Sequence, residues 1–335
     1  MNATPEVRMK IDMIGAGSLG LLLAGSLIEA GHEIRLWCRT SEQSAELYAK
    51  GITVSDEKGR ARLQIAGERF AASPVEDFSG HYLQQSADLI VITVKQNVFH
   101  EQLPQYLLPL QRTAPVVVCF QNGIGHMELL ERLLPQADIY AAVTTAGSRR
   151  KTLTEVISPA NGGIWVGRWL TAELNGGADD SAVQTAGVAI SFVHALSAAG
   201  FAAFLSKQVV TMIYRKLLIN AVINPLTAIW RVPNGELLAS EQRLAVMREL
   251  YEEALRVYDA AGIDYEADSW ESILEVCRTT AGNTSSMLAD ILAARRTEIS
   301  WINGSIVGMA ERLNMEVPLH RWISRLVEGM FAEER

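Results

Sequence analysis

The stretch that decides the fold is "KIDMIGAGSLGLLLAGSLIEAG", residues 10–31. Its opening "KIDMI" (10–14) is typical of a short strand, and "SLGLLLAGSLIEAG" (18–31) is typical of a helix that ends at a glycine. The loop between them carries three glycines in G-x-G-x-x-G spacing: Gly15, Gly17 and Gly20.

A G-x-G-x-x-G motif alone has low specificity, but its place after a strand and before a helix favours a dinucleotide site. The glycines allow a tight turn, close approach of the backbone to a pyrophosphate, and close helix packing. The N-terminus of the helix supplies free N–H groups for the phosphates. The alternative is a purely structural strand-to-helix turn. The residues that we expect to contact the cofactor here are Gly15, Ala16, Gly17, Ser18, Leu19 and Gly20.

Further along the first half, apolar and β-branched runs alternate with helical segments, which predicts a doubly wound α/β sheet of the Rossmann type. We expect two short strands, "GITVSD" and "ARLQIAG", around the turn-rich "EKGR". We also expect a hairpin over 150–167 with Gly162–Gly163 near its turn, and a surface loop over 170–180. The other expected strands are "EIRLWC" (33–38), "DLIVITV" (88–94), "PVVVCF" (115–120) and "DIYAAVTTAG" (138–147).

The second half reads as an all-helical C-terminal domain. A chain of 335 residues is too long for one ordinary core and fits two domains. We place the boundary after "FAAFLS", so that residues 1–206 form the Rossmann-like domain and residues 207–335 the helical one. The expected helices are 208–229, 240–261, 267–280, 286–312 and 318–331.

Composition restricts the classes of partner. The net charge of −8 and the pI near 5.4 disfavour nucleic acid or an anionic membrane. No apolar stretch reaches the roughly 18 residues that we expect of a membrane span, and the N-terminal residues lack the apolar region of a secretory signal. Three scattered cysteines, two of them in strand-like apolar runs and read as small core residues, and the absence of an H-x-x-x-H pair predict no disulfide framework and no metal site. A cytoplasmic protein is the expectation. The cysteines are Cys38, Cys119 and Cys277.

Three positions at predicted strand ends bear on the cofactor. An NAD site usually places an acidic residue after the second strand, but this chain has Arg39 there, which suits the 2′-phosphate of NADP(H). Lys95 ends the strand "DLIVITV" and can pair with the same phosphate. Asn122 follows "PVVVCF", beside glycines that let a ligand approach the backbone. The alternatives are solvated cations and a turn asparagine.

"YRKLLINAVINPLTAIW", residues 214–230, predicts a mostly apolar helix that carries Lys216, Asn220 and Asn224 at four-residue steps. Because a four-residue step advances about 40° beyond one turn, these side chains share a face. Buried unpaired polar groups are costly, so the face needs water, partners or a ligand. Pro225 disfavours helical backbone at Asn224, and we expect a kink there that opens a cleft wall. The alternative is a solvated surface.

Taken together, these segments resemble the ketopantoate reductase (2-dehydropantoate 2-reductase) family over nearly the whole chain. The resemblance is carried by "GAGSLG", "VITVK", "QNGIG", "RKLLINAVINPLTAIW", "PNGEL" and "SSMLADILAARRTEISWINGS". It implies a Rossmann domain followed by a helical domain, an active site in the cleft between them, and NADPH-dependent reduction of the 2-oxo acid 2-dehydropantoate to pantoate.

The resemblance also implies roles for single residues. Lys216 matches the family's general acid, and Glu298 matches an essential glutamate that orients Lys216 or binds the ribose of the cofactor. Asn122 matches an asparagine that touches cofactor and substrate, and Ser148 a residue near the nicotinamide. One departure from the family pattern is Gln121, where a histidine is common. The residues matched to substrate binding are Asn122, Lys216, Asn220, Asn224, Asn234 and Ser286.

Local sequence gives two of these residues other interpretations. Ser286 follows "NTS", so it can be the N-cap of the predicted helix 286–312. Glu298 would lie in the middle of that helix, where a glutamate is usually solvated or paired with Arg295. Two other functions stay open, namely a reductase of another 2-oxo acid and a non-catalytic NADP(H) sensor. The sequence does not decide between a monomer and a homodimer.

Overall fold

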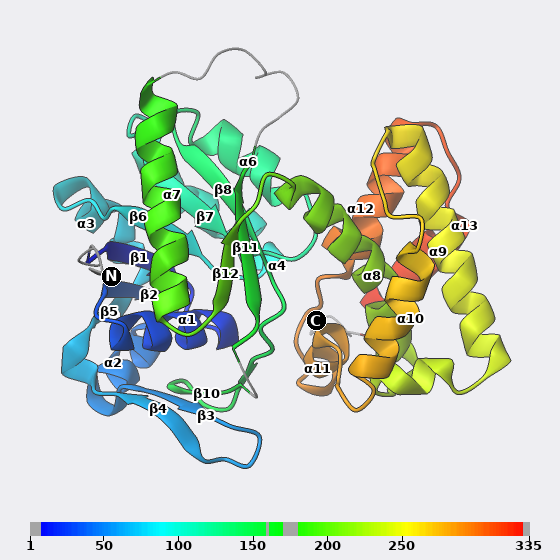
Figure 1. Cartoon of the computed structure of the whole chain (residues 1–335), viewed down its shortest axis with the longest axis horizontal. Coiled ribbons are helices and arrows are strands. Elements are labelled where there is room, and N and C mark those ends of the chain that lie inside the picture. The colour runs from blue at the N-terminus through cyan, green and yellow to red at the C-terminus, as the bar shows by residue number, and fades with distance from the viewer. Residues whose placement is uncertain (1–7, 159–160, 170–179, 331–335) are drawn as a thin grey trace, which may run out of the picture. The chain divides into compact units, whose positions relative to one another are not determined.

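The computed structural model describes residues 8–158, 161–169 and 180–330, with side chains from 180 to 186 excepted. Contacts divide the chain into two compact units (Figure 1). Unit 1 comprises residues 1–121 and 126–209, and unit 2 comprises residues 122–125 and 210–335. The domain boundary at 206/207 remains a prediction. The predicted surface loop at 170–180 lies almost wholly outside the described residues.

Unit 1 is built on an eight-stranded sheet in the order β12-β11-β8-β7-β6-β1-β2-β5. All neighbouring pairs are parallel except β11 and β8, so the sheet is mixed. This confirms the expected α/β class. The strands are β1 (Lys10–Ile14), β2 (Glu33–Cys38), β5 (Ala71–Pro74), β6 (Leu89–Ile92), β7 (Val116–Cys119), β8 (Asp138–Thr144), β11 (Gly163–Arg168) and β12 (Ala202–Leu205).

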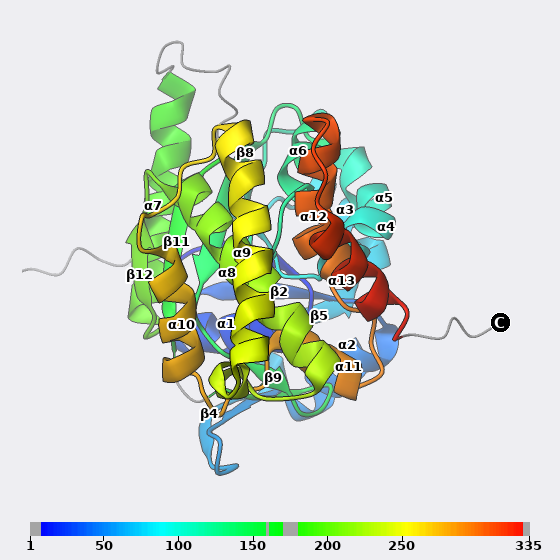
Figure 2. The same ribbon diagram turned by 90° about the vertical axis from the view of Figure 1, so that its right-hand side faces the viewer.

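Helices cover both faces of this sheet, as Figures 1 and 2 show: α1 and α7 lie on one face and α3 to α6 on the other. The α1 helix is apolar on every side because it is buried between the large sheet and a smaller one. The helices are α1 (Ser18–Glu29), α2 (Ser41–Lys50), α3 (Phe78–Gln84), α4 (Gln96–Glu101), α5 (Leu103–Leu107), α6 (His126–Leu133) and α7 (Asp180–Ala198), and short 3-10 turns lie at Gly67–Arg69, Val75–Asp77 and Leu108–Leu110.

The smaller sheet has the order β4-β3-β10-β9. The strands β3 (Ile52–Ser55) and β4 (Ala61–Ile65) are the short strands predicted around "EKGR", and they pair antiparallel. The hairpin predicted over 150–167 is wrong. Its two halves, β10 (Glu155–Ile157) and β11, belong to different sheets, because β10 pairs with β3 and β9 (Arg149–Arg150) while β11 pairs with β8 and β12.

Unit 2 is helical, as expected. One predicted element is wrong: the run 286–312 is two helices, α11 and α12, and Ala294 between them has a positive φ of 50° that ends α11. The helices are α8 (Val209–Trp230), the 3-10 helix η5 (Asn234–Leu238), α9 (Glu241–Ala261), α10 (Ser269–Thr279), α11 (Ser286–Leu292), α12 (Ile299–Arg312) and α13 (Pro318–Glu328).

The α8 helix corrects the expectation on membrane-length segments. It is the one described helix long and apolar enough to span a membrane, with a mean hydropathy of 1.2. Half of that window is buried inside the structure, however, and its residues Leu217, Ala221 and Val222 belong to the hydrophobic core of unit 2. The core position of α8 accounts for its apolar composition.

A buried ion pair joins two neighbouring strands of unit 1, β1 and β2. Asp12 on β1 faces Arg35 on β2, which donates from Nε and Nη2 at 2.8 Å, and Trp37 Nε1 donates to the same carboxylate at 2.8 Å. Burial raises the pKa of Asp12, against the opposing effect of these partners. The carboxylate therefore depends on partners from the neighbouring strand.

Replacing Asp12 by Leu should lower the free energy of unfolding by about 3–5 kcal/mol, because Arg35 would stay buried without its counter-charge. The control is Glu29→Gln, which breaks the exposed pair with Arg69 and should cost less than about 1 kcal/mol. Denaturant unfolding of both variants measures the difference. Equal losses of unfolding free energy in the two variants would contradict a stabilising role for the buried Asp12–Arg35 pair.

Candidate active site

The glycine loop needs glycine at two positions for steric reasons. Gly15 has a φ of 114°, which side chains rarely adopt. A Cβ on Gly20 would lie 1.9 Å from the carbonyl oxygen of Gly15, so α1 can pack against the loop only without a side chain there. Thr93, which follows β6, donates from Oγ1 to the same carbonyl at 2.8 Å. The turn is therefore fixed from within unit 1.

Gly17 is different, because a Cβ there would meet nothing within 4 Å. It is the N-cap of α1, and neither a side-chain cap nor an acidic residue occupies the first turn. The first N–H groups of a helix lack intrahelical partners, and this end carries a partial positive charge. The open space beside Gly17 and these donors fit the pyrophosphate of a dinucleotide.

Gln43, which no sequence pattern singled out, holds the outer side of the glycine loop. Gln43 on α2 is 4% exposed and donates from Nε2 to Ala16 O at 2.8 Å and to Leu153 O at 2.9 Å. A glutamine in a helix is usually solvated, so only its burial identifies this role. Its two bonds tie the glycine loop to the segment before β10.

The predicted cofactor cations follow strands on either side of β1. Arg39 is exposed directly after β2, and Lys95 is partly buried before α4. Since β2 and β6 flank β1, the two strand ends lie roughly 10 Å apart. Thr40, beside Arg39, accepts at Oγ1 from Gln43 N as the N-cap of α2. Ser148 lies partly buried before β9.

In unit 2, the face of α8 carries the predicted catalytic lysine. Lys216 is partly buried, and loss of solvation lowers its pKa from 10.5 to about 8, while the carboxylate of Glu298 acts in the opposite direction. The structure thus places these two residues within electrostatic reach. Glu298 is not mid-helix, as predicted, but the N-cap residue of α12. At neutral pH the lysine is mostly an ammonium that can lose its proton.

The structure also brings Asn224 and Ser286 together. Asn224 is 6% exposed and donates from Nδ2 to Ser286 Oγ at 3.5 Å. The cap of α11 is Ser285, whose Oγ accepts from Leu288 N at 3.1 Å. The alternative interpretation of Ser286 as the N-cap is therefore wrong, and its exposed hydroxyl remains available to a ligand.

Hydrogen bonds hold residues 280–285, the segment before α11, against α8 and η5. Thr227, one turn after Asn224, shares a 2.7 Å hydrogen bond with Ser285. Asn234 donates from its backbone to Asn283 O at 3.0 Å and from Nδ2 to Thr280 Oγ1 at 2.8 Å. The Oδ1 of Asn234 is buried and has no hydrogen-bond partner in the described part of the chain. It is thus an acceptor that suits a donor on a ligand. Asn220 is partly buried on α8.

The loop 122–125 groups with unit 2, and Ile124 packs on its core. Gly123 has a φ of 79°, and a Cβ there would lie 2.2 Å from Trp301 O on α12. Asn122 is partly buried beside it. Gln121 donates from Nε2 to Ile92 O at 3.0 Å and to Val94 O at 2.9 Å. Glutamine at this position therefore has a structural role at the sheet edge.

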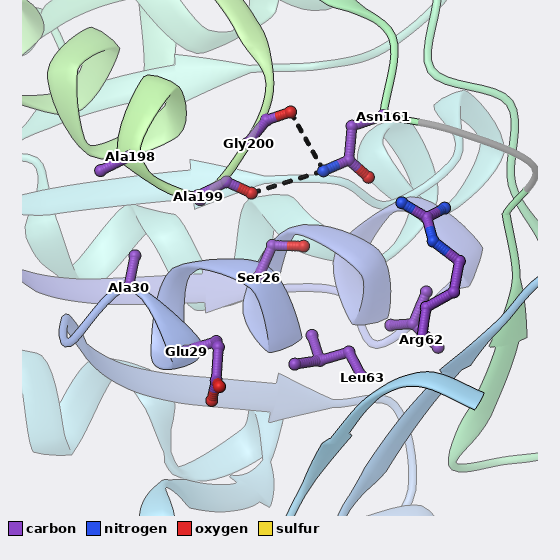
Figure 3. Close-up of a pocket in the computed structure, with 10 residues that line it drawn as sticks. Ser26, Glu29, Ala30, Arg62, Leu63, Asn161, Ala198, Ala199 and Gly200 are labelled. Carbon is purple, nitrogen blue, oxygen red and sulfur yellow. Dashed lines mark hydrogen bonds between the residues drawn. The ribbon is translucent and has the colours of Figure 1, made fainter.

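A pocket elsewhere in unit 1 is unrelated to these residues. It has a volume of about 280 Å³ and lies near the end of α1, between β3–β4 and Asn161 (Figure 3). Asn161 donates to Ala199 O and Gly200 O at its rim. None of the predicted site residues lines it. Within the described ranges, no group of three or more His, Cys, Asp or Glu side chains could hold a metal ion.

A dinucleotide loop on a largely parallel sheet, followed by a helical unit with a lysine and amides, defines a two-unit nicotinamide-dependent oxidoreductase. Comparison with known proteins is more specific. Residues 11–171 match the family model of ketopantoate reductase PanE/ApbA, and residues 208–331 match the model of its C-terminal part. The chain belongs to the ketopantoate reductase family.

Individual relatives agree with this assignment. The chain is similar to the 2-dehydropantoate 2-reductase of Bacillus subtilis, with 33% identity over 89% of this chain and 90% of the relative. Among solved structures, a PanE/ApbA family ketopantoate reductase from Ralstonia eutropha is 25% identical with a TM-score of 0.80, over 96% of this chain and 98% of that one. A D-mandelate dehydrogenase with NADH and anilino(oxo)acetate, 22% identical with a TM-score of 0.81 over 96% and 98%, shares the fold.

The two glycines of the loop should respond differently to alanine. Gly17→Ala should melt as the unmodified protein does and bind NADPH about ten- to a hundredfold more weakly, as expected for one lost phosphate contact. Gly20→Ala should lower both the melting temperature and the affinity, because its Cβ meets backbone. Thermal melting and fluorescence titration measure both. Identical behaviour of the two variants would refute the steric distinction.

A serine pair tests the second part of the site. Ser285→Ala should lower the free energy of unfolding by about 1–2 kcal/mol through loss of the cap. Ser286→Ala should change stability by less than about 0.5 kcal/mol but raise the substrate KM. Denaturant unfolding and steady-state kinetics distinguish the two. A stable Ser285→Ala together with a destabilised Ser286→Ala would reverse our assignment.

Proposed function

We propose that this chain catalyses the NADPH-dependent reduction of 2-dehydropantoate (ketopantoate) to (R)-pantoate, in pantothenate and coenzyme A biosynthesis. The observation that carries the proposal is Lys216, a partly buried ammonium with a lowered pKa, on the same helix face as Asn220 and Asn224. Membership of the ketopantoate reductase family supports the choice of substrate.

The cofactor proposed for unit 1 is NADP(H), which supplies a hydride to the ketone carbon when bound. The N–H groups at the start of α1 and the open space beside Gly17 would hold the pyrophosphate. Arg39 would hold the 2′-phosphate, with Lys95 as its second cation. Ala16, Ser18 and Leu19 would contribute backbone contacts. We assign Ser148 and Asn122 to the nicotinamide end.

The substrate is a small 2-oxo acid with a hydroxyl group. Asn220 and Asn224 would bind its carboxylate and hydroxyl, and Ser286 would add a hydroxyl contact. Asn234 offers a buried acceptor, Oδ1, that suits the substrate hydroxyl. Asn122 would contact substrate and cofactor together.

Lys216 would act as the general acid. As the ketone is reduced, its oxygen gains negative charge, which the ammonium stabilises before it delivers the proton. A pKa near 8 lies close to the operating pH, where a general acid is most effective. Glu298 would then serve Lys216, because its carboxylate keeps the lysine protonated despite burial. Binding of the cofactor ribose is its other proposed role.

The fold alone does not select the substrate, since a D-mandelate dehydrogenase shares it. The direct test is loss of NADPH absorbance with ketopantoate, compared with other branched 2-oxo acids at matched concentrations. A kcat/KM highest for ketopantoate supports the proposal. Faster turnover of another 2-oxo acid would favour a retuned reductase, and binding of NADPH without turnover would favour a sensor. We propose a cytoplasmic location. Measurement of the molar mass in solution distinguishes a monomer from a homodimer.

Lys216→Ala should lower kcat by roughly 10²–10⁴, the range for loss of a general acid. In the unmodified protein, kcat/KM should hold below pH 8 and fall above it, because the active form is the protonated one and its pKa is about 8. In Glu298→Gln this fall should begin at lower pH, since the opposing charge is gone. A profile that rises through pH 8 would exclude the acid role.

Arg39→Ala should weaken NADPH far more than NADH, by about tenfold or more, because only NADPH loses a charge-assisted phosphate contact. Glu42→Gln, on the exposed start of α2, is a control that should leave the NADPH-to-NADH preference in place. Michaelis constants for both cofactors measure the preference. Equal constants in the unmodified protein would contradict the NADP(H) assignment.

A further inference from the structure

The backbone of α8 lacks one hydrogen-bond donor within the site. In a regular helix the carbonyl of residue 221 accepts from the N–H of residue 225. Here residue 225 is Pro225, which has no N–H, yet α8 is helical from Val209 to Trp230. Ala221 is fully buried, so water cannot supply the missing donor. An unsatisfied carbonyl would therefore lie in the turn between Asn220 and Asn224.

A side chain from another helix fills this gap. Asn303 on α12 is fully buried and donates from Nδ2 to Ala221 O at 2.8 Å. The second hydrogen of the same nitrogen points to His320 Nδ1 at 3.0 Å. His320 Nε2 lies 3.0 Å from Leu250 O, which can only accept, so Nδ1 must be the acceptor atom of this ring.

These bonds fix the orientation of the Asn303 amide. Burial lowers the pKa of His320 to about 4, so the ring is neutral at pH 7 and keeps the tautomer that Leu250 requires. Both neighbours of Nδ2 are acceptors, whereas Asn303 Oδ1 has no hydrogen-bond partner within the described residues. Rotating the amide by 180° would place two acceptors against an oxygen. The nitrogen therefore stays on Ala221.

We propose that Asn303 is a positioning residue for substrate binding: its amide replaces the hydrogen bond that Pro225 removes and so sets the turn of α8 that presents Asn220 and Asn224. The proposal rests on the proposed function, because those two amides are the residues assigned to the 2-oxo acid. It adds a residue that touches neither substrate nor cofactor. The N-cap residue of the same helix is Glu298, whose charge acts on Lys216.

A double-mutant cycle with Pro225 tests this proposal. Asn303→Leu should raise the KM for ketopantoate about tenfold, the effect of one unsatisfied buried carbonyl, and leave the dissociation constant of NADPH within about twofold. Alanine at position 225 restores a backbone N–H for Ala221. In a Pro225→Ala background, Asn303→Leu should therefore raise KM by no more than about twofold. An equal rise in both backgrounds would overturn the proposal.

A control separates positioning from general stability. Val327→Ala removes fully buried core atoms two turns beyond His320 on α13. It should lower the melting temperature and leave the KM for ketopantoate unchanged. A similar KM rise in Val327→Ala, or an unchanged KM in folded Asn303→Leu, would overturn the proposal. If Asn303→Leu alone does not fold, recovery of a folded protein by adding Pro225→Ala supports it, and failure of recovery overturns it.

The cycle also separates this inference from the proposed function. Unmodified protein that does not turn over ketopantoate refutes the function. The melting temperatures of the four proteins then still test the hydrogen bond, because the loss from Asn303→Leu should be smaller in the Pro225→Ala background. Additive melting shifts would overturn the inference whatever the substrate.

Discussion

The helical unit depends on one constraint: α8 must be the centre of an apolar core and also present an ammonium and two amides on one face. Other side chains of the helix are buried in the core: Leu217, Ala221 and Val222 are at most 1% exposed. The cost of this arrangement is visible at Lys216, whose pKa falls to about 8 because it has lost solvent. The lowered pKa suits the proposed role of Lys216 as a general acid, since an unperturbed lysine would release its proton reluctantly near neutral pH.

The compensation comes largely from α12. The Glu298 carboxylate at its start opposes the loss of charge at Lys216. The carbonyl of Trp301 lies close to Gly123, and Asn303 donates the hydrogen bond that Pro225 cannot. Three parts of the candidate site thus depend on α12. The break that makes Glu298 the N-cap residue of α12 lies at Ala294, whose positive φ ends α11.

Sequence reasoning predicted the α/β unit with its strands β1, β2, β6, β7 and β8, the helical unit and the polar face of α8, because these depend on local patterns of hydrophobic residues and glycines. It did not predict the strands β5 and β12. It failed where long-range pairing or burial decides. The strands β10 and β11 read as a hairpin but pair elsewhere, and Ser285 rather than Ser286 caps α11. The roles of Gln43 and Asn303 could not be predicted from local sequence, because their hydrogen-bond acceptors, Ala16 O and Ala221 O, lie 27 and 82 residues away.

The central claim is that Lys216 is held partly desolvated and that Glu298 supports its charge. NMR titration of the protein with ¹³C-labelled lysine side chains, with Lys216→Arg used to assign the signal, measures this directly. The account predicts a midpoint near 8 for Lys216 and a lower midpoint in Glu298→Gln. A midpoint near 10.5, unaffected by Glu298→Gln, would contradict it.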